Sequence, residues 1–219
     1  MHNIRVFYNK TQRAKYISHL DINRCMQRAL KRSGLPVWFT EGFHTHIYVT
    51  FALPTPLGFE SMYEVMDFRL VEELPMKEVV RRLNEHLPQG IEIWGAGAPV
   101  MKPERIKYAE YDLSLTYLDK TGAETGAHLE EFMEQESIIV TKKTKKKVKE
   151  IDLKPLVSVL HTEVCGDTLK LTIRTNAGIL LNVNPMLFLE AFESRYGLRS
   201  DYWKITKKKV LDENLKDFV

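Results

Sequence analysis

The sequence predicts an α+β protein built from two tandem ferredoxin-like halves, each an antiparallel sheet with the element order β-α-β-β-α-β. Segments of β-prone residues or apolar alternation are interrupted by segments in which apolar residues have helical spacing. The series occurs once in residues 1–98 and again, approximately, in residues 108–219. Between them, residues 95–107 are rich in glycine and proline, which predicts a linker.

The first half begins with a predicted strand at residues 4–8, followed by an amphipathic helix. Ser18 and Asp21 form a variant capping box that predicts the start of this helix. Gly34 and Pro36 predict its end. The remaining elements are expected as strand material at 37–39 and 47–51, a strand at 63–70, a helix at 76–87 and a strand at 91–94.

The second half repeats this order without a visible sequence repeat, so the duplication is an inference from architecture alone. Pro185 at the start and Gly197 at the end predict the last helix. A lysine run at 142–149 predicts an additional basic hairpin arm. The other elements are expected at 111–117 (strand), 128–135 (helix), 137–140, 157–164 and 168–174 (strands), 185–196 (helix) and 203–210 (strand).

The composition is that of an ordinary globular protein, with 44% hydrophobic and 28% charged residues among 219. No apolar run approaches the roughly 20 residues that span a bilayer, and the N-terminus lacks the apolar core of a signal peptide, so we expect a cytoplasmic protein. Cys25 and Cys165 are far apart and no C-x-x-C pair occurs, which predicts reduced thiols, no metal site and no cofactor. A net charge of +3 does not by itself establish a nucleic-acid partner.

The first candidate site is the start of the first helix. His19 stands where the partial positive charge of a helix attracts anions, and an imidazole there is suited to proton transfer near neutral pH. The alternative is that Ser18 and Asp21 simply cap the helix while His19 packs against the turn.

A row of cations follows on the same helix at i, i+4, i+7 and i+8: Arg24, Arg28, Lys31 and Arg32. No acidic residue interrupts the row, which indicates a surface that binds a phosphate backbone. The alternative is the charged outer face that any surface helix has.

The second candidate site is the bend that contains Gly42, Phe43, His44 and His46. In an extended segment the two imidazoles point the same way. They supply at most half of a metal site, and a third ligand would have to come from Glu41 or Glu64 through the fold. We therefore expect imidazoles that face solvent or a ligand.

Two acidic residues, Glu64 and Asp67, lie in a predicted strand and are expected to form an ion pair with Arg24 or Arg28. Lys145 and Lys147 belong to the first lysine run, and residues 204–209 hold a second. If those two segments are neighbouring strands, their charges form one patch that favours polyanions without sequence specificity.

Three motifs carry a family resemblance: Y-I-S-H-L-D-I-N-R-C-M-Q-R-A-L-K-R-S-G-L-P at 16–36, G-F-H-T-H at 42–46 and S-M-Y-E-V-M-D at 61–67. The chain resembles the radical SAM-linked family, found fused to or encoded beside cobalamin-binding radical SAM proteins. The resemblance implies a bacterial cytoplasmic protein that acts with a radical SAM partner, in RNA modification, and it implies no catalytic residue. Thr45 and Ile47 stand where the family usually has proline. The C-x-x-x-C-x-x-C cluster motif is absent, so the chain itself lacks the usual ligands of that iron–sulfur cluster.

A weaker resemblance, of architecture and not of motif, is to the RAMP superfamily of CRISPR repeat-processing endoribonucleases, which also resemble tandem ferredoxin-like folds with a histidine on a helix.

Three functions follow. The favoured one is an RNA- or polyanion-binding module; the others are a metal-independent, RAMP-like endoribonuclease with His19 or His44 as the acid–base group, and an interaction scaffold without nucleic acid. The favoured function requires that the helix start and the glycine bend form one surface, from His19, Asp21, Arg24, Arg28, Gly42, Phe43, His44 and His46.

Overall fold

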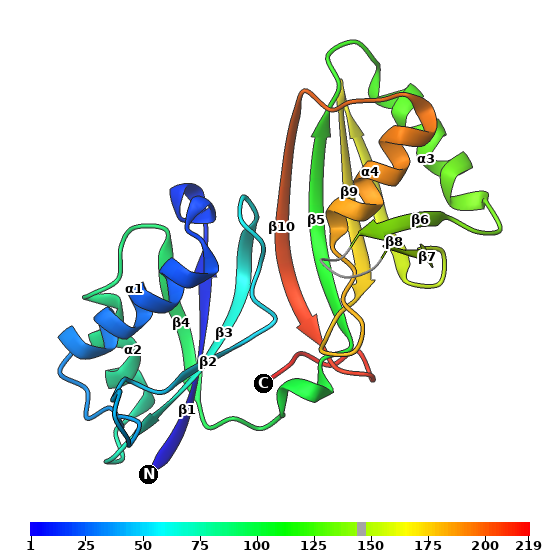
Figure 1. Ribbon diagram of the computed structural model, residues 1–219. Helices are drawn as coiled ribbons and strands as arrows, with labels where there is room; N and C mark the ends of the chain where they lie inside the picture. The colour runs from blue at the N-terminus through cyan, green and yellow to red at the C-terminus, as the bar shows by residue number, and fades with distance from the viewer. Residues whose placement is uncertain (144–147) are drawn as a thin grey trace. The chain divides into compact units, whose positions relative to one another are not determined.

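The computed structural model describes residues 1–143 and 148–219 and shows an α+β chain that divides into two units (Figure 1). Unit 1 comprises Met1–Arg105 together with Asp217–Val219, and unit 2 comprises Ile106–Lys216. The last three residues thus belong with the first unit, which no boundary drawn along the sequence anticipates. Among the described residues, no helix has the length and apolar character that a bilayer crossing requires.

Unit 1 has the element order β-α-β-β-α-β, and its strands all pair antiparallel in the order β4-β1-β3-β2. Two short 3₁₀ turns, Gln12–Tyr16 and Pro103–Arg105, lie outside this series. The six elements are β1 (His2–Lys10), α1 (His19–Arg32), β2 (Val49–Ala52), β3 (Glu60–Leu70), α2 (Met76–Asn84) and β4 (Ile91–Gly97).

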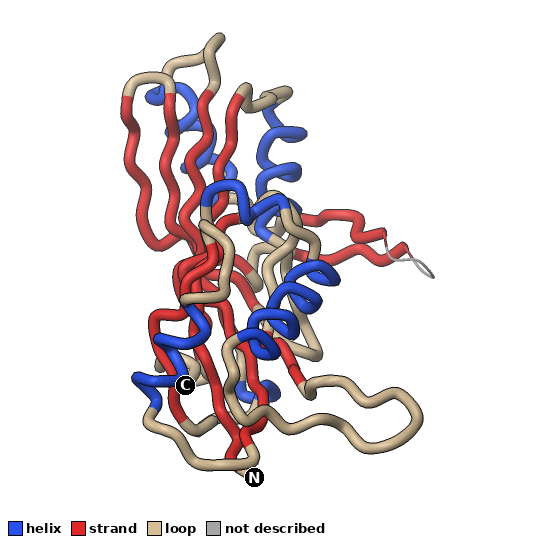
Figure 2. The backbone as a smooth tube through the Cα atoms, turned by 90° about the vertical axis from the view of Figure 1, so that its left-hand side faces the viewer, coloured by secondary structure: helices blue, strands red, loops and turns tan. Residues whose placement is uncertain are grey.

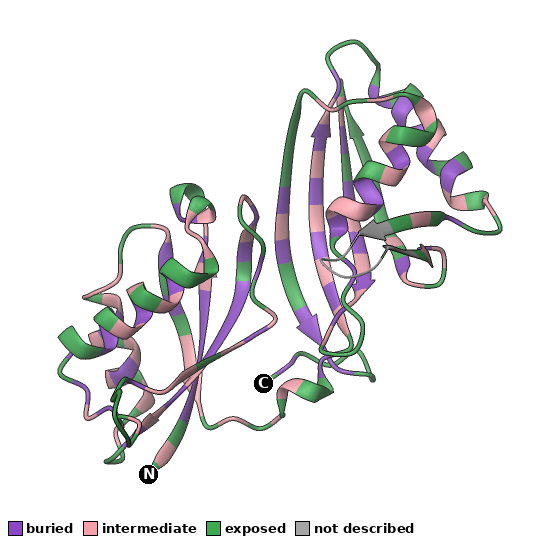
Figure 3. Ribbon diagram, viewed as in Figure 1, coloured by how far each residue is buried: buried purple, intermediate pink, exposed green. Residues whose placement is uncertain are grey.

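The core of unit 1 lies between this sheet and its two helices. Val6 and Tyr8 of β1 are in one buried cluster with Met26 of α1 and with Val79 and Leu83 of α2. Apolar residues at helical spacing on α1 and α2 face the apolar side of the strands, as the sequence pattern predicts. The sides of both helices that face away from the sheet are exposed (Figure 3), and they carry charged residues such as Arg24 and Arg81.

One stretch of unit 1 is less regular than predicted. Instead of a strand at 37–39, the structure has isolated bridges from Val37 to Leu70 and from Phe39 to Ile47. Within residues 37–52, regular pairing with β3 is confined to β2, where Val49 faces Phe68. The polar bend at residues 40–46 leaves the sheet between these points and interrupts the ladder.

Unit 2 has the strand order β10-β5-β9-β8, again with antiparallel pairing. Two further strands, β6 and β7, pair with each other as a separate ribbon, seen in Figure 2. The elements are β5 (Tyr108–Thr116), α3 (Gly122–Glu134), β6 (Ile139–Lys143), β7 (Val148–Asp152), β8 (Val157–Cys165), β9 (Thr168–Asn176), α4 (Pro185–Tyr196) and β10 (Tyr202–Leu211).

Helix α3 begins six residues before the predicted helical spacing, at Gly122 rather than at His128. Its start is a full capping box, in which the Thr121 side chain accepts from the Glu124 N–H and the Glu124 carboxylate accepts from the Thr121 N–H. Gly122 lies against Val164 of β8 and the turn at Gly166, and Gly126 lies against Val164, so small residues occupy the packing positions and hide the apolar period.

Candidate functional site

The start of α1 is capped by hydrogen bonds within its first turn. The Ser18 side chain accepts from the Asp21 N–H at 3.2 Å and donates to the Asp21 carboxylate at 2.7 Å. The hydrogen bond from Ser18, followed by that from Arg24, lowers the pKa of the Asp21 carboxyl. The capping interpretation of Ser18 and Asp21 is confirmed.

His19 is exposed, and its ring lies edge-on to Phe51 of β2 at a centroid distance of 5.1 Å. An acid–base role in RNA cleavage would need a second titratable group in contact with this imidazole. None of the described residues forms a hydrogen bond or ion pair with the His19 side chain. Among the described residues, the His19 imidazole therefore has no acid–base partner in contact with it.

The arginine row of α1 lines a groove of about 550 Å³. One wall is the exposed side of α1, and the other is the segment that follows α2. Lys31, on the same helix, does not line it. The lining residues are Asp21, Arg24, Cys25, Arg28, Arg32, Glu85, His86, Leu87 and Pro88.

The three groove arginines differ in what faces their charge. Arg24 forms an ion pair with Asp21 at 3.1 Å, and both side chains are more than half exposed. Arg32 donates to the backbone carbonyl of His86 at 2.7 Å, a neutral acceptor that leaves its charge uncompensated. Within the described part of the chain, nothing pairs with Arg28, which is exposed. The middle of the row is thus the site where an added anion meets an unused guanidinium.

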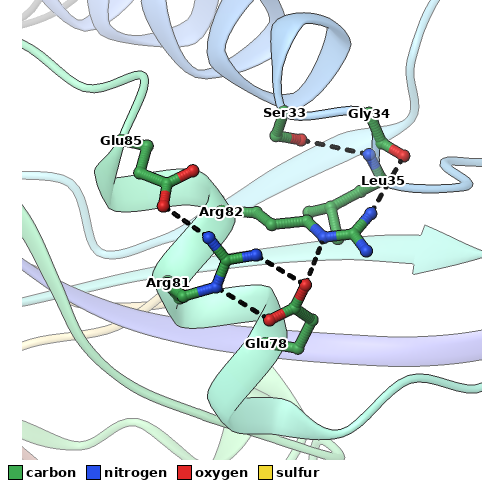
Figure 4. Close-up of polar contacts among 7 residues, drawn as sticks. All are labelled: Ser33, Gly34, Leu35, Glu78, Arg81, Arg82 and Glu85. Carbon is green, nitrogen blue, oxygen red and sulfur yellow. Dashed lines mark hydrogen bonds and ion pairs between the residues drawn. The ribbon is translucent and has the colours of Figure 1, made fainter.

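A charge ladder on α2 precedes the wall opposite α1 and is shown in Figure 4. The Glu78 carboxylate accepts from Arg81 and from Arg82, each at 2.7 Å, and these bonds lower the pKa of the Glu78 carboxyl to about 2. Arg81 also pairs with Glu85, so this acidic residue of the groove already has a cation. Arg82 donates to the carbonyl of Gly34 at 3.4 Å and so connects α2 to the end of α1.

The glycine bend is a self-contained loop. The His46 N–H donates to the Thr40 hydroxyl at 3.1 Å, and its ring Nδ1 lies 3.0 Å from the carbonyl of His44. Gly42 has a φ of 112°, which explains the need for glycine. Phe43 is fully exposed. The bend is not an extended segment, so the condition under which the two imidazoles would point the same way is not met, and the His46 ring turns back onto its own loop.

The predicted convergence of the helix start and the bend is not found among the described contacts. His19 contacts Phe51, which pairs with Met66, whereas the base of the bend connects to β3 through the bridge at Leu70. Four residues of a strand separate these points, or about 13 Å. The bend residues therefore do not line the arginine groove.

The predicted ion pairs of Glu64 and Asp67 with the α1 arginines are also wrong. Asp67 pairs with Arg5 through two hydrogen bonds of 2.7 Å, and Glu64 is buried and accepts from the Thr55 hydroxyl at 2.9 Å. Strand β3 faces β1, and Arg5 is directly opposite Asp67 in the ladder. The position across the strand pair thus determines that Asp67 pairs with Arg5 and not with an arginine of α1.

The predicted lysine patch requires the two lysine-bearing segments to be neighbouring strands, and the described strands are not paired in this way. Lys145 and Lys147 lie outside the described residues. The strands that flank them, β6 and β7, pair with each other, while β10 pairs with β5 in unit 2. In the second run Lys207 is fully buried and Lys208 lies 3.5 Å from Asp112.

Two features of unit 1 have no counterpart in the predicted site. The segment His86–Pro88 forms the second groove wall, and no local pattern marks it. Arg5 stands within the apolar run of β1, a departure that signals a buried charge requiring a partner.

Comparisons with known proteins place these observations in a family. The chain belongs to the family described as "Uncharacterized protein conserved in bacteria (DUF2344)", whose model matches residues 3–185. No curated protein matches the chain. Among solved structures, one similar chain is "Crystal Structure of an Unknown Protein from Galdieria sulphuraria", with 14% identity, coverage of 94% of this chain and 98% of that one, and a TM-score of 0.26. A TM-score this low supports no statement about fold or function.

Proposed function

We propose that this DUF2344 protein is an RNA- or polyanion-binding module that acts with a partner radical SAM enzyme in RNA modification. The single surface expected from the helix start and the glycine bend does not carry this proposal, because the bend does not line the groove. The observation that carries it is the row of Arg24, Arg28 and Arg32 along one wall of a groove in unit 1. Guanidinium groups bind phosphate oxygens through paired N–H donors, which suits them to nucleic-acid backbones.

The charge balance of the groove supports an anionic ligand. Its acidic residues, Asp21 and Glu85, are each paired with an arginine, whereas Arg28 has no such partner in the described chain. A phosphate placed at Arg28 gains a charge-assisted hydrogen bond without breaking an existing ion pair. The contacts are to phosphate, so binding should depend on salt and be largely independent of base sequence.

The proposal is tested by the binding of bulk tRNA across a salt series, measured by filter retention. The triple variant Arg24→Gln/Arg28→Gln/Arg32→Gln should bind weakly and with a flatter salt dependence, because fewer counterions are released. Lys31→Gln removes an exposed cation from the same helix outside the groove, and it should bind like the unaltered protein. Undetectable binding at low salt refutes the proposal, and equal losses in the two variants refute the assignment to the groove.

The radical SAM partner is a separate part of the proposal, supported by the motif resemblance across residues 16–67. The test is co-purification of such an enzyme with tagged protein, with and without nuclease treatment. If the enzyme binds this protein directly, it should still co-purify after nuclease treatment. Survival combined with no RNA binding would instead favour an interaction scaffold.

We also propose that both units are ferredoxin-like. In each unit the first strand is central, beside the third and fourth, and the second is at the edge, once the β6–β7 ribbon is counted as an insertion. All pairings within these sheets are antiparallel. An experimental structure of either unit tests this assignment through the strand order alone.

A further inference from the structure

We infer that the arginine groove of unit 1 takes a single strand of RNA, with three successive phosphates against Arg24, Arg28 and Arg32. This inference rests on the proposed function. It adds the class of nucleic acid and the orientation of the bound strand, which runs along the axis of α1.

The spacing of the arginines supports a single strand. Residues at i, i+4 and i+8 lie on nearly the same side of a helix and are separated by about 6 Å per step along its axis. This separation is close to that of neighbouring phosphates in an extended nucleic-acid strand. The row therefore presents three guanidinium groups over about 12 Å. Arg28 can offer all its donors to a phosphate, whereas Arg24, paired with Asp21, and Arg32, bonded to the His86 carbonyl, would use their remaining N–H donors. A free mononucleotide would engage only one member of the row.

The composition of the two walls supports the same ligand. Arg28 and its neighbours provide the cationic wall, while Cys25, Leu87 and Pro88 contribute apolar atoms. A single strand has a charged backbone on one side and exposed riboses and bases on the other, so it matches a groove of mixed character. A duplex turns its bases inward and offers phosphates and hydroxyls to both walls.

The size of the groove also favours one strand. Its volume of about 550 Å³ lies within the range of sites that enclose a small ligand, and it is bounded by one helix and one short segment. Proteins that read double-stranded RNA by shape span about 16 base pairs. Nothing in this groove offers a surface of that extent.

The first test compares nucleic acids of the same sequence. A labelled twelve-residue oligouridylate is titrated alone and as a duplex with oligoadenylate, and fluorescence anisotropy is measured across a salt series. We expect the single strand to bind more tightly. Arg28→Gln should weaken its binding about ten-fold and lower the salt slope by about 0.7, the value for one phosphate of a single strand. Lys31→Gln should leave the slope unchanged.

The second test uses the two cysteines of the chain as reporters. Cys25 lines the groove and is half-buried, whereas Cys165 is exposed on β8 in unit 2. A saturating single strand should slow maleimide labelling of Cys25 several-fold and leave the labelling rate of Cys165 unchanged. Peptide mass spectrometry after timed quenching separates the two sites, and this experiment requires no variant.

The outcomes separate this inference from the proposed function. Duplex binding as tight as single-strand binding, or binding that neither protects Cys25 nor depends on Arg28, overturns the inference and leaves a polyanion-binding module with its site elsewhere. Absence of binding to either form at low salt overturns both. Preferential single-strand binding with protection of Cys25 alone supports both.

Discussion

Substitution of Asp67 by asparagine is expected to destabilise unit 1 by about 3 kcal/mol, the low end for removing one partner of a buried ion pair. Arg5 is 1% exposed and donates to both Asp67 carboxylate oxygens at 2.7 Å. Its Nη1 donates to the carbonyls of Met101 and Val219 at 2.8 and 3.0 Å, and its guanidinium lies 4.4 Å from the centre of the Phe218 ring. Asparagine has nearly the same shape, so the loss comes from a buried cation without a counter-charge.

The assay is urea denaturation followed by tryptophan fluorescence in a Trp203→Phe background. The chain has three tryptophans, and the two that remain, Trp38 and Trp94, lie in unit 1. The fluorescence transition then reports unfolding of unit 1, and its midpoint and slope give the free energy of that transition.

A matched control separates the buried pair from a general charge effect. Glu85→Gln removes one partner of an exposed pair with Arg81 in the same unit and should cost less than about 1 kcal/mol. A cost below about 1 kcal/mol for Asp67→Asn would refute the reasoning, because the pair would then behave as a surface pair. The double variant Arg5→Met/Asp67→Leu should recover much of the loss, since both charges leave together.

Three further predictions concern local structure. Thr121→Ala removes the capping hydroxyl of α3 and should cost unit 2 about 1 kcal/mol, measured by urea denaturation with circular dichroism; no change would contradict the cap. Gly178→Ala should cost more than about 1 kcal/mol, because φ is 131° and a Cβ would lie 2.5 Å from the carbonyl oxygen of Ile106; Gly166→Ala, at a φ of 62° in open space, should cost less. The carboxyl of Glu78, with a pKa of about 2, contributes stability above pH 4.5 that is lost as the pH falls toward 2, and Glu78→Gln should lack this component. A carbon-13 titration midpoint near 4.5 would contradict the ladder on α2.

The elements that the sequence predicted well are those whose ends are marked locally. Helix α4 runs from Pro185 to Tyr196 as predicted, because a proline at its first turn and Gly197 after it act through nearby backbone atoms alone. The start of α3 was missed because its packing positions are glycines, which carry no apolar period. The interrupted ladder at residues 37–47 depends on distant pairing with β3, which local pattern does not report.

The candidate site divides in the same way. The row from Arg24 to Arg32 was visible because helical spacing alone places its members on one side. The partner of Asp67 was not visible, since it depends on strand register between β1 and β3. The placement of His44 and the second groove wall at Pro88 likewise depend on tertiary structure, which a local sequence pattern does not predict.

The arginines of unit 1 show why partners, rather than positive charge, distinguish structural from functional cations. Arg5 and Arg82 each donate hydrogen bonds to a carboxylate and to backbone carbonyls of the same unit, so an added phosphate would have to displace existing bonds. Arg28 donates no hydrogen bond to any described residue. Holding an exposed cation beside Arg24 and Arg32 adds like-charge repulsion at i and i+4, which costs a few tenths of a kcal/mol per pair in an isolated helix. An anionic ligand along the row attracts each of these cations and so offsets their mutual repulsion. For this reason the groove, rather than the lysine-rich segments, is the site to test first.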